Sequence, residues 1–298
     1  MENPRARVLV TGIAGNLAGR LAARLEADDR VRSITGIDLR RPRHQLKRTD
    51  LVRADLRSPL IARVIESAGI DTIVHLSTGA AVGSLQLFGA ARKAPRLRKV
   101  VARSTTAVYG GSSAAPAFWR EDATPGDARP PGYSKDAVEV EGYARAFGRR
   151  RTEVTLTILR FADIAGAGVD TPLARYLSLP VVPTVLGYDP RLQLCHQDDA
   201  VEVLVRATLE EHPGVYNVAG PGILYLSQAI RRVGKMPVPV PLPLVNGLER
   251  VLRHVGVPAL PANLLYGCVG DITSLRERFG YEPKFSTGAA LDGWRAAR

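Results

Sequence analysis

The sequence VLVTGIAGNLAG, residues 8–19, is a short β-branched run that stops at a glycine-rich turn and continues into a helical pattern. Gly12 and Gly15 lie in the turn, and from Leu17 on the apolar residues recur at the spacing of one helix face. Glycine permits a tight turn and a close approach of phosphates to the backbone, where the first N–H groups of a helix have no partner. The small Ala18 lets the helix pack on the strand. The stretch predicts a strand–turn–helix unit that binds the pyrophosphate of a dinucleotide.

Acidic residues follow at the ends of the next two strand-like runs, where a dinucleotide-binding unit carries a carboxylate for the ribose. The second strand-like run, VRSITGID, ends in Asp38, and Asp55 follows the next short run. A carboxylate at the end of the second strand hydrogen-bonds the adenosine ribose hydroxyls and repels a 2′-phosphate, so Asp38 favours NAD. Arg40 and Arg41 stand directly after it and could instead clamp that phosphate, which leaves NADP as the alternative.

Strand and helix patterns alternate along the first half of the chain. Strand-like runs cover residues 71–77, 99–105, 154–166 and 214–220, and helical patterns cover residues 58–69, 83–93 and 133–149. Strands separated by helices pair in parallel through right-handed crossovers. We therefore predict an α/β fold, a doubly wound parallel sheet, with a small C-terminal substrate lobe. The dinucleotide-binding domain is expected over residues 1–170, with 191–220 returning to it, and the apolar, proline-rich lobe over 171–190 and 221–298.

Composition narrows the class of protein. The net charge is +12, but the basic residues are scattered, and no zinc finger, RNA-recognition motif or basic arm is present, so nucleic acid is not the expected partner. A basic surface that attracts a phosphate-bearing ligand accounts for the charge. No apolar run is long enough to span a bilayer, and the N-terminus lacks a signal-peptide pattern. Two cysteines outside any metal-ligand spacing predict neither a disulfide framework nor a metal site, and a reducing cytoplasm is the expected location.

Several of these segments together resemble the extended short-chain dehydrogenase/reductase superfamily, in its NAD-dependent epimerase/dehydratase branch. The resemblance is carried in order by TGIAGNLAG, GID, IVHLST, STTAVYGG, YSKDAVEVE, LRFADIAG, LQLCHQDDAVEVL and VYNVAGPG, and it covers nearly the whole chain. It implies a Rossmann fold, an NAD cofactor, and hydride transfer at a carbinol or keto carbon, as in epimerases, dehydratases and reductases. The cofactor contacts that we expect are Gly12, Ile13, Ala14, Gly15, Asn16, Leu17, Asp38, Leu39, Arg40, Asp55, Leu56, Leu76, Ser77, Thr78, Lys135 and Phe161.

The catalytic positions implied by the resemblance are incomplete. In active members a Ser or Thr, a Tyr and a Lys cooperate, and here Thr105 and Lys135 fill two of these places while Pro131 stands at the tyrosine place. None of the nine tyrosines has a lysine four residues later. Tyr133 precedes Lys135 by two residues, which on one helix places them roughly 200° apart. Tyr133 therefore reaches the site only if the helix begins after it.

The substrate positions also depart from the pattern. The resemblance implies substrate contacts at Thr106, Asp163 and Arg191. Asp163 stands where sugar-nucleotide enzymes carry an asparagine, and an ionised carboxylate there repels a diphosphate. The arginine of the family falls on Leu192, with Arg191 adjacent as its substitute. The segment between IVHLST and KVVARST is shorter than in typical members, which removes part of the wall above the nicotinamide and part of the helix through which such proteins commonly form homodimers.

Two functions remain open from these residues. The first is an enzyme that keeps Thr105 and Lys135 and takes its acid from Tyr133, Asp163 or an ordered water. The second is a non-catalytic protein that binds NAD(H) as a sensor or scaffold. The substrate stays unassigned.

Three further features are expected to be structural. His75 is expected to support the cofactor loop, and His196 with the two following aspartates to form a strand-to-helix junction, with Asp199 as the helix cap. Glu139 and Glu141 are assigned to surface charge.

Overall fold

The computed structural model describes residues 5–77, 81–111, 116–124, 133–241 and 266–297. The chain divides into two compact units. The first contains residues 1–104, 131–160 and 201–216, and the second contains 105–130, 161–200 and 217–298. These units differ from the expected division at residues 105–130, 161–170, 191–200 and 217–220, which group with the second unit.

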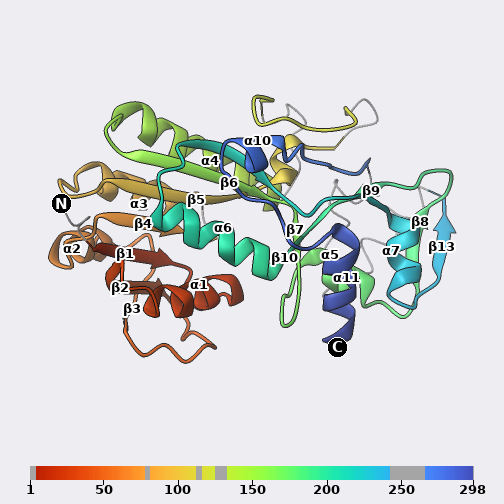
Figure 1. The fold of residues 1–298 in the computed structure, drawn as a ribbon, viewed down its shortest axis with the longest axis horizontal. Helices are drawn as coiled ribbons and strands as arrows, with labels where there is room; N and C mark the ends of the chain where they lie inside the picture. The colour runs from red at the N-terminus through yellow and green to blue at the C-terminus, as the bar shows by residue number, and fades with distance from the viewer. Residues whose placement is uncertain (1–4, 78–80, 112–115, 125–132, 242–265, 298) are drawn as a thin grey trace. The chain divides into compact units, whose positions relative to one another are not determined.

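A seven-stranded sheet forms the centre of the first unit (Figure 1). Its order is β11-β6-β5-β4-β1-β2-β3, and β1 pairs in parallel with both β2 and β4. The strands are β1 Ala6–Thr11, β2 Val31–Asp38, β3 Thr49–Arg53, β4 Thr72–His75, β5 Lys99–Thr105, β6 Thr155–Phe161 and β11 Gly214–Val218. The chain reverses direction along the sheet after β3, where it returns past β1 to form β4, and this is the doubly wound order that the sequence predicts.

Helices cover this sheet because each has one apolar face. The helices are α1 Asn16–Glu26, α2 Leu60–Ser67, α3 Ala81–Arg92, α4 Tyr133–Arg150 and α6 Gln197–Leu209. One continuous core lies between the sheet and α2, α3 and α4, where Ile61, Phe88 and Phe147 are among the buried side chains. The predicted α/β class with a parallel sheet is confirmed.

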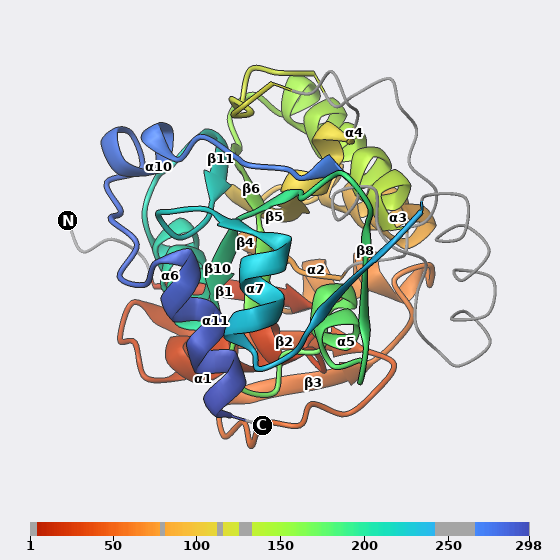
Figure 2. The same cartoon turned by 90° about the vertical axis from the view of Figure 1, so that its right-hand side faces the viewer.

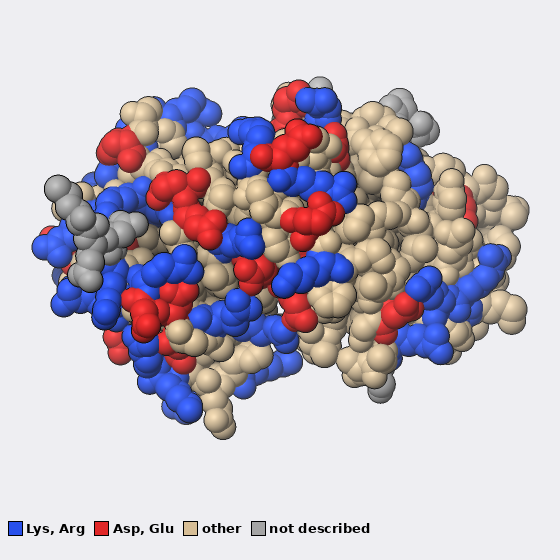
Figure 3. All heavy atoms as spheres, viewed as in Figure 1, with Lys and Arg blue, Asp and Glu red and all other residues tan. Residues whose placement is uncertain are grey.

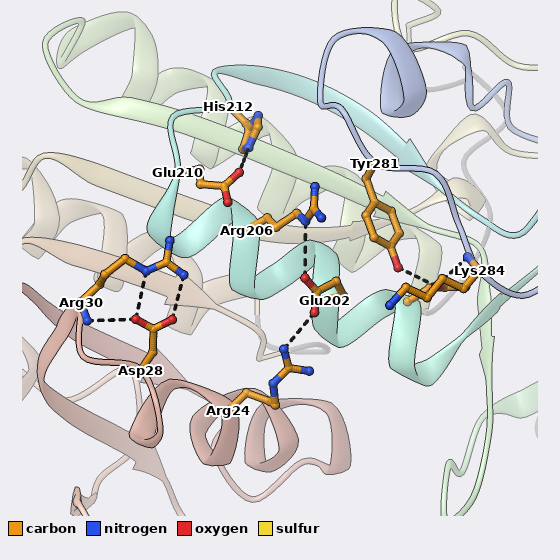
Figure 4. Close-up of polar contacts among 10 residues, drawn as sticks. Arg24, Asp28, Arg30, Glu202, Arg206, Glu210, His212, Tyr281 and Lys284 are labelled. Carbon is orange, nitrogen blue, oxygen red and sulfur yellow. Dashed lines mark hydrogen bonds and ion pairs between the residues drawn. The ribbon is translucent and has the colours of Figure 1, made fainter.

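Charged side chains link α1 to α6 within the first unit (Figure 4). Glu202 accepts a hydrogen bond from Arg24 at 2.9 Å and lies 3.4 Å from Arg206, one turn later on α6. On the face shown in Figure 3, Lys and Arg side chains are interspersed with Asp and Glu. That mixture fits the scattered basic residues of the sequence.

The second unit is built from short elements around its own core. They are η1 Thr106–Tyr109, β7 Asp163–Ala165, α5 Pro172–Leu177, β8 Val182–Val185, β9 Arg191–Leu192, β10 Leu194–His196, β12 Leu224–Tyr225, α7 Leu226–Arg232, β13 Pro237–Val240, α10 Thr273–Glu277 and α11 Thr287–Ala296. The strands form three two-stranded sheets. Figure 2 labels α5, α7, α11, β8 and β10 of this unit. Tyr176, Ile230 and Trp294 are among the side chains of this core.

One expectation about the strand-to-helix junction is corrected. Helix α6 begins at Gln197, so Asp199 lies inside the first turn and does not cap it. Its carboxylate instead accepts hydrogen bonds from the Tyr281 hydroxyl at 2.6 Å and from the backbone N–H groups of Lys284 and Phe285. Asp199 therefore fixes the segment 281–285 to the start of the helix, beside which Figure 4 shows Tyr281 and Lys284.

No helix in the described part of the chain is long and apolar enough to cross a membrane.

Candidate functional site: a dinucleotide cleft in the first unit

A cleft of about 740 Å³ opens within the first unit, above the ends of several strands. The phosphate turn, the ends of β2 and β4, the residues after β3, and the first turns of α3 and α4 form its walls. The lining residues are Gly12, Ile37, Asp38, Leu39, Arg40, Ala54, Asp55, Leu56, Arg57, Ser77, Ala81, Val82, Gly83, Lys135, Asp136 and Glu139. A cleft outside the carboxyl ends of parallel strands is where doubly wound sheets bind nucleotides.

The phosphate turn has the geometry that its glycines predict. Gly12 has a φ of +73°, and a Cβ there would lie 3.1 Å from the backbone of Ser77. Gly15 has extended backbone angles and caps the start of α1, and its N–H donates to the Gly12 carbonyl at 2.9 Å. The first turn of α1 carries no acidic residue. The positive end of the helix dipole and its N–H groups therefore suit a pyrophosphate.

Asp38 is held at the end of β2 by two backbone donors. The N–H of Ala14 donates to Oδ2 at 3.2 Å, and the N–H of Arg40 donates to Oδ1 at 3.0 Å. The Arg40 side chain is 81% exposed, and its Nε lies 4.0 Å from the carboxylate. The remaining lone pairs of Asp38 face a cleft where ribose hydroxyls could donate to them.

A second carboxylate in the cleft has an arginine partner that the sequence did not reveal. Arg57 donates to Asp55 from both Nε and Nη2, the latter at 2.6 Å. These hydrogen bonds lower the pKa of Asp55 to about 2, so it is ionised at neutral pH. Arg57 reaches Asp55 because the loop after β3 folds back on itself. The spacing of two residues alone does not predict this ion pair or its place in the cleft.

Helix α4 contributes three charged residues to the cleft. Lys135 was predicted, whereas Asp136 and Glu139 were not. Lys135 Nζ lies 3.8 Å from Glu139, which is four positions later and on the same helix face. Helix α4 begins at Tyr133, so positions 133 and 135 are both helical. The side chain of Tyr133 and the whole of Pro131 lie outside the described residues.

The remaining predicted cofactor residues support the cleft or lie elsewhere. Ile13 is 1% exposed and packs where a Cβ on Gly36 would be, so it sits beneath the turn. Asn16, Leu17 and Leu76 do not line the cleft, Thr78 lies outside the described residues, and Phe161 is buried in the second unit.

The predicted Thr105 and the substrate residues belong to the second unit. Thr105 Oγ1 accepts a hydrogen bond from the Ala107 N–H at 3.3 Å, which leaves its own proton available to donate. The Thr106 carbonyl accepts from the Cys268 thiol at 3.2 Å. Burial raises the pKa of Cys268 to about 12, with Asp163 adding to the rise, so the thiol stays protonated. Arg191 donates to the Pro116 carbonyl at 3.4 Å.

Solved structures show where this fold occurs. A UDP-glucose 4-epimerase from Thermotoga maritima, solved with UDP-glucose, matches 97% of both chains with a TM-score of 0.76 and 19% identity. A UDP-glucuronic acid 4-epimerase from Bacillus cereus, solved with UDP-glucuronic acid and NAD, matches 97% of this chain and 98% of its own with a TM-score of 0.73 and 18% identity. At these identities the likeness establishes the fold.

Sequence comparison gives the family. The uncharacterized protein Rv0501 of Mycobacterium tuberculosis is 41% identical over 98% of this chain and 84% of its own length. The family model for NAD dependent epimerases and dehydratases matches residues 8–219, more than half of the chain. The predicted family and its NAD cofactor are thereby confirmed, and the chain belongs to the NAD-dependent epimerase/dehydratase family.

Proposed function

We propose that this protein binds NAD(H) in the cleft of the first unit and catalyses reversible hydride transfer at a carbinol or keto carbon of a sugar-nucleotide-type substrate, with a non-standard acid/base. The observation that carries the proposal is the convergence of Gly12, Asp38 and Lys135 on one cleft. A positive-φ glycine at a helix N-terminus, a carboxylate held by backbone donors, and a lysine suit the pyrophosphate, a ribose and the second ribose of a dinucleotide in turn. The UDP-sugars in the related solved structures support the substrate class.

The chain's own residues have distinct parts in this proposal. The nicotinamide ring, when bound, supplies the hydride acceptor and donor. Lys135 contributes a positive charge that binds a ribose hydroxyl and lowers the pKa of a neighbouring acid. Thr105 hydrogen-bonds the reacting oxygen through the hydroxyl proton that its capping bond leaves free. The candidate acids are Tyr133, Asp163 and an ordered water. Because α4 begins at Tyr133, positions 133 and 135 lie roughly 200° apart on one helix, which favours Asp163 or a water over Tyr133.

A sensor or scaffold that binds NAD(H) without turnover is the second candidate. It is favoured by the proline at the usual tyrosine place and by the helical start of α4 at Tyr133, two positions before Lys135. In that case Lys135 and its partner Glu139 bind the cofactor only.

A paired measurement separates the two candidates. NADH binding is followed by fluorescence, and turnover is followed with UDP-sugars and with hydroxy or keto substrates. An enzyme should lose turnover in Lys135→Met, and in Tyr133→Phe or Asp163→Asn according to which group is the acid, while the exposed Lys93→Met serves as the matched lysine control. NADH binding without turnover of any substrate, unaltered by Tyr133→Phe, supports the sensor. Absence of binding by any nicotinamide nucleotide refutes both.

A further inference from the structure

A buried histidine joins three segments beside the cleft of the first unit. His75, the last residue of β4, is 0% exposed. Its Nδ1 lies 2.7 Å from the hydroxyl of Thr11, the last residue of β1, and its Nε2 lies 2.8 Å from the hydroxyl of Ser84 on α3. Both ring nitrogens are therefore engaged by side chains far apart in the sequence. The ring also makes an edge contact with Phe88, at 5.8 Å and 82°, which fixes its plane.

The hydrogen bonds run in one direction through the ring. Burial lowers the pKa of His75 to about 4, so the imidazole is neutral at neutral pH and has one N–H and one lone pair. One hydroxyl must therefore donate to the ring while the other accepts from it. The Thr11 hydroxyl also accepts from the backbone N–H of Leu76 at 3.3 Å, which ties β1 to the residue after the histidine. An apolar side chain of the same size would leave two buried hydroxyls without this partner.

Each partner stands next to a wall of the cleft. Thr11 directly precedes Gly12 in the phosphate turn, and Ser84 directly follows Gly83, which lines the opposite wall with Ala81 and Val82. Ser77, two residues after the histidine, lies so near the turn that only a glycine fits at position 12. The spacing between the phosphate turn and the first turn of α3 is thus bridged by one imidazole.

We propose that His75 is a positioning residue for the dinucleotide, which sets the distance between the phosphate turn and the start of α3 without touching the ligand. This inference rests on the proposed binding of NAD(H). It assigns to Thr11 and Ser84 the same role through their hydroxyl groups. Loss of either hydroxyl lets the two walls shift relative to each other, and ligand affinity falls because the turn and the helix no longer hold their spacing.

Matched variants test the hydroxyl role. NADH titration by fluorescence at 15 °C and thermal unfolding are measured for the full chain and for Thr11→Val, Thr11→Ser, Ser84→Ala and His75→Leu. Loss of the hydrogen bond between Ser84 and His75 should raise the Kd for NADH about fivefold in Ser84→Ala. Thr11→Val loses the bonds to His75 and to the Leu76 N–H, and His75→Leu loses both ring bonds, so each should raise the Kd about tenfold or more. Thr11→Ser keeps the hydroxyl and should restore affinity.

A distant threonine provides the control for stability alone. Thr157 on β6 is buried in the same unit, and its hydroxyl donates to the His212 carbonyl at 2.6 Å. Thr157→Val should lower the melting temperature without changing the Kd for NADH. If Thr11→Val and Ser84→Ala also lower the melting temperature but bind NADH as the wild type does, His75 is only structural and the inference is wrong. A wild type that binds no nicotinamide nucleotide refutes the proposed function itself, and the inference with it.

Discussion

The carboxylate of Glu141 is the most completely paired buried charge among the described ion pairs of the first unit. It is 1% exposed and accepts hydrogen bonds from Ser104 Oγ at 2.9 Å, from Arg160 Nε at 3.1 Å and from Arg145 Nε at 3.0 Å. Arg160 is itself 0% exposed, whereas Arg145 is 38% exposed. The cluster joins the end of β5 to α4 and β6. It therefore holds in place the helix that brings Lys135 to the cleft.

Removing the charge of Glu141 should destabilise the fold strongly, because it leaves the buried guanidinium of Arg160 without a compensating carboxylate. We expect Glu141→Gln to lower the free energy of unfolding by about 3–5 kcal/mol, as for other buried pairs that lose one partner. Arg160→Met should cost less, because Arg145 and Ser104 still compensate the carboxylate. In the double variant Glu141→Gln with Arg160→Met, neither side chain carries a buried charge. Its cost should fall below the sum of the single costs by about 2 kcal/mol.

Urea unfolding followed by circular dichroism at pH 7 measures these differences. Glu282→Gln is the control, since its pair with Arg276 has an N–O distance of 2.8 Å but the carboxylate is 66% exposed. That change should cost less than about 1 kcal/mol. A loss below about 1 kcal/mol in Glu141→Gln, or a double variant whose cost equals the sum, would refute the reasoning.

The same cluster makes the stability of the protein depend on pH in the acid range. Burial raises the pKa of Glu141, but hydrogen bonds and charge from Arg160 and then Arg145 outweigh it and lower the pKa below the usual 4.5. The unfolded chain therefore takes up the proton first as the pH falls. The contribution of Glu141 to stability is complete above pH 4.5 and is lost as the pH falls through its folded pKa. Glu141→Gln should lack this loss in a pH series of unfolding curves.

Three further predictions concern other residues. Burial lowers the pKa of His75 from 6.5 to about 4, so the wild type should lose about 3 kcal/mol of stability as the pH falls from 6.5 to 4, and an equal slope of melting temperature in His75→Leu would contradict this. The Lys99 ammonium donates to the carbonyls of Thr208 in α6 and Glu210 just after it, at 3.3 and 2.7 Å, and lies 3.0 Å from the Glu211 carboxylate. Lys99→Met should therefore cost about 1–3 kcal/mol in urea unfolding, and a cost no larger than that of the exposed Lys93→Met would count against it. Asp38→Ser should weaken NADH binding about tenfold and reduce the preference over NADPH, and an unchanged preference in calorimetry would show that Asp38 does not select the cofactor.

The phosphate turn illustrates what local sequence reveals. Gly12, Gly15 and Asp38 were predicted from spacing alone, because the chemistry of a strand–turn–helix unit constrains a few consecutive residues. The structure gives Gly12 a positive φ and brings Asp38 to the same cleft. The family and its NAD cofactor followed from the order of several such motifs, and the family comparison confirms both.

Glu139 and Glu141 show the limit of the same reasoning. The sequence assigns both to surface charge, and Glu139 keeps a 40% exposed side chain while it lines the cleft, whereas Glu141 is buried with two arginines. Glu139 had a usable signal, since it lies four residues after Lys135 on one helix face. Glu141 had none, because its partner Arg160 is 19 residues away on a different element.

Local periodicity and residues a few positions apart predict the order of strands and helices, the glycine turn and the acidic Asp38. They can do so because backbone geometry permits few arrangements over short stretches. Which charges are buried, how His75 meets a hydroxyl 64 positions away, and which face of α4 meets the cleft depend on packing between distant segments. A charge can be buried stably only when side chains from other elements compensate it, and a local sequence pattern does not show which distant side chains do so.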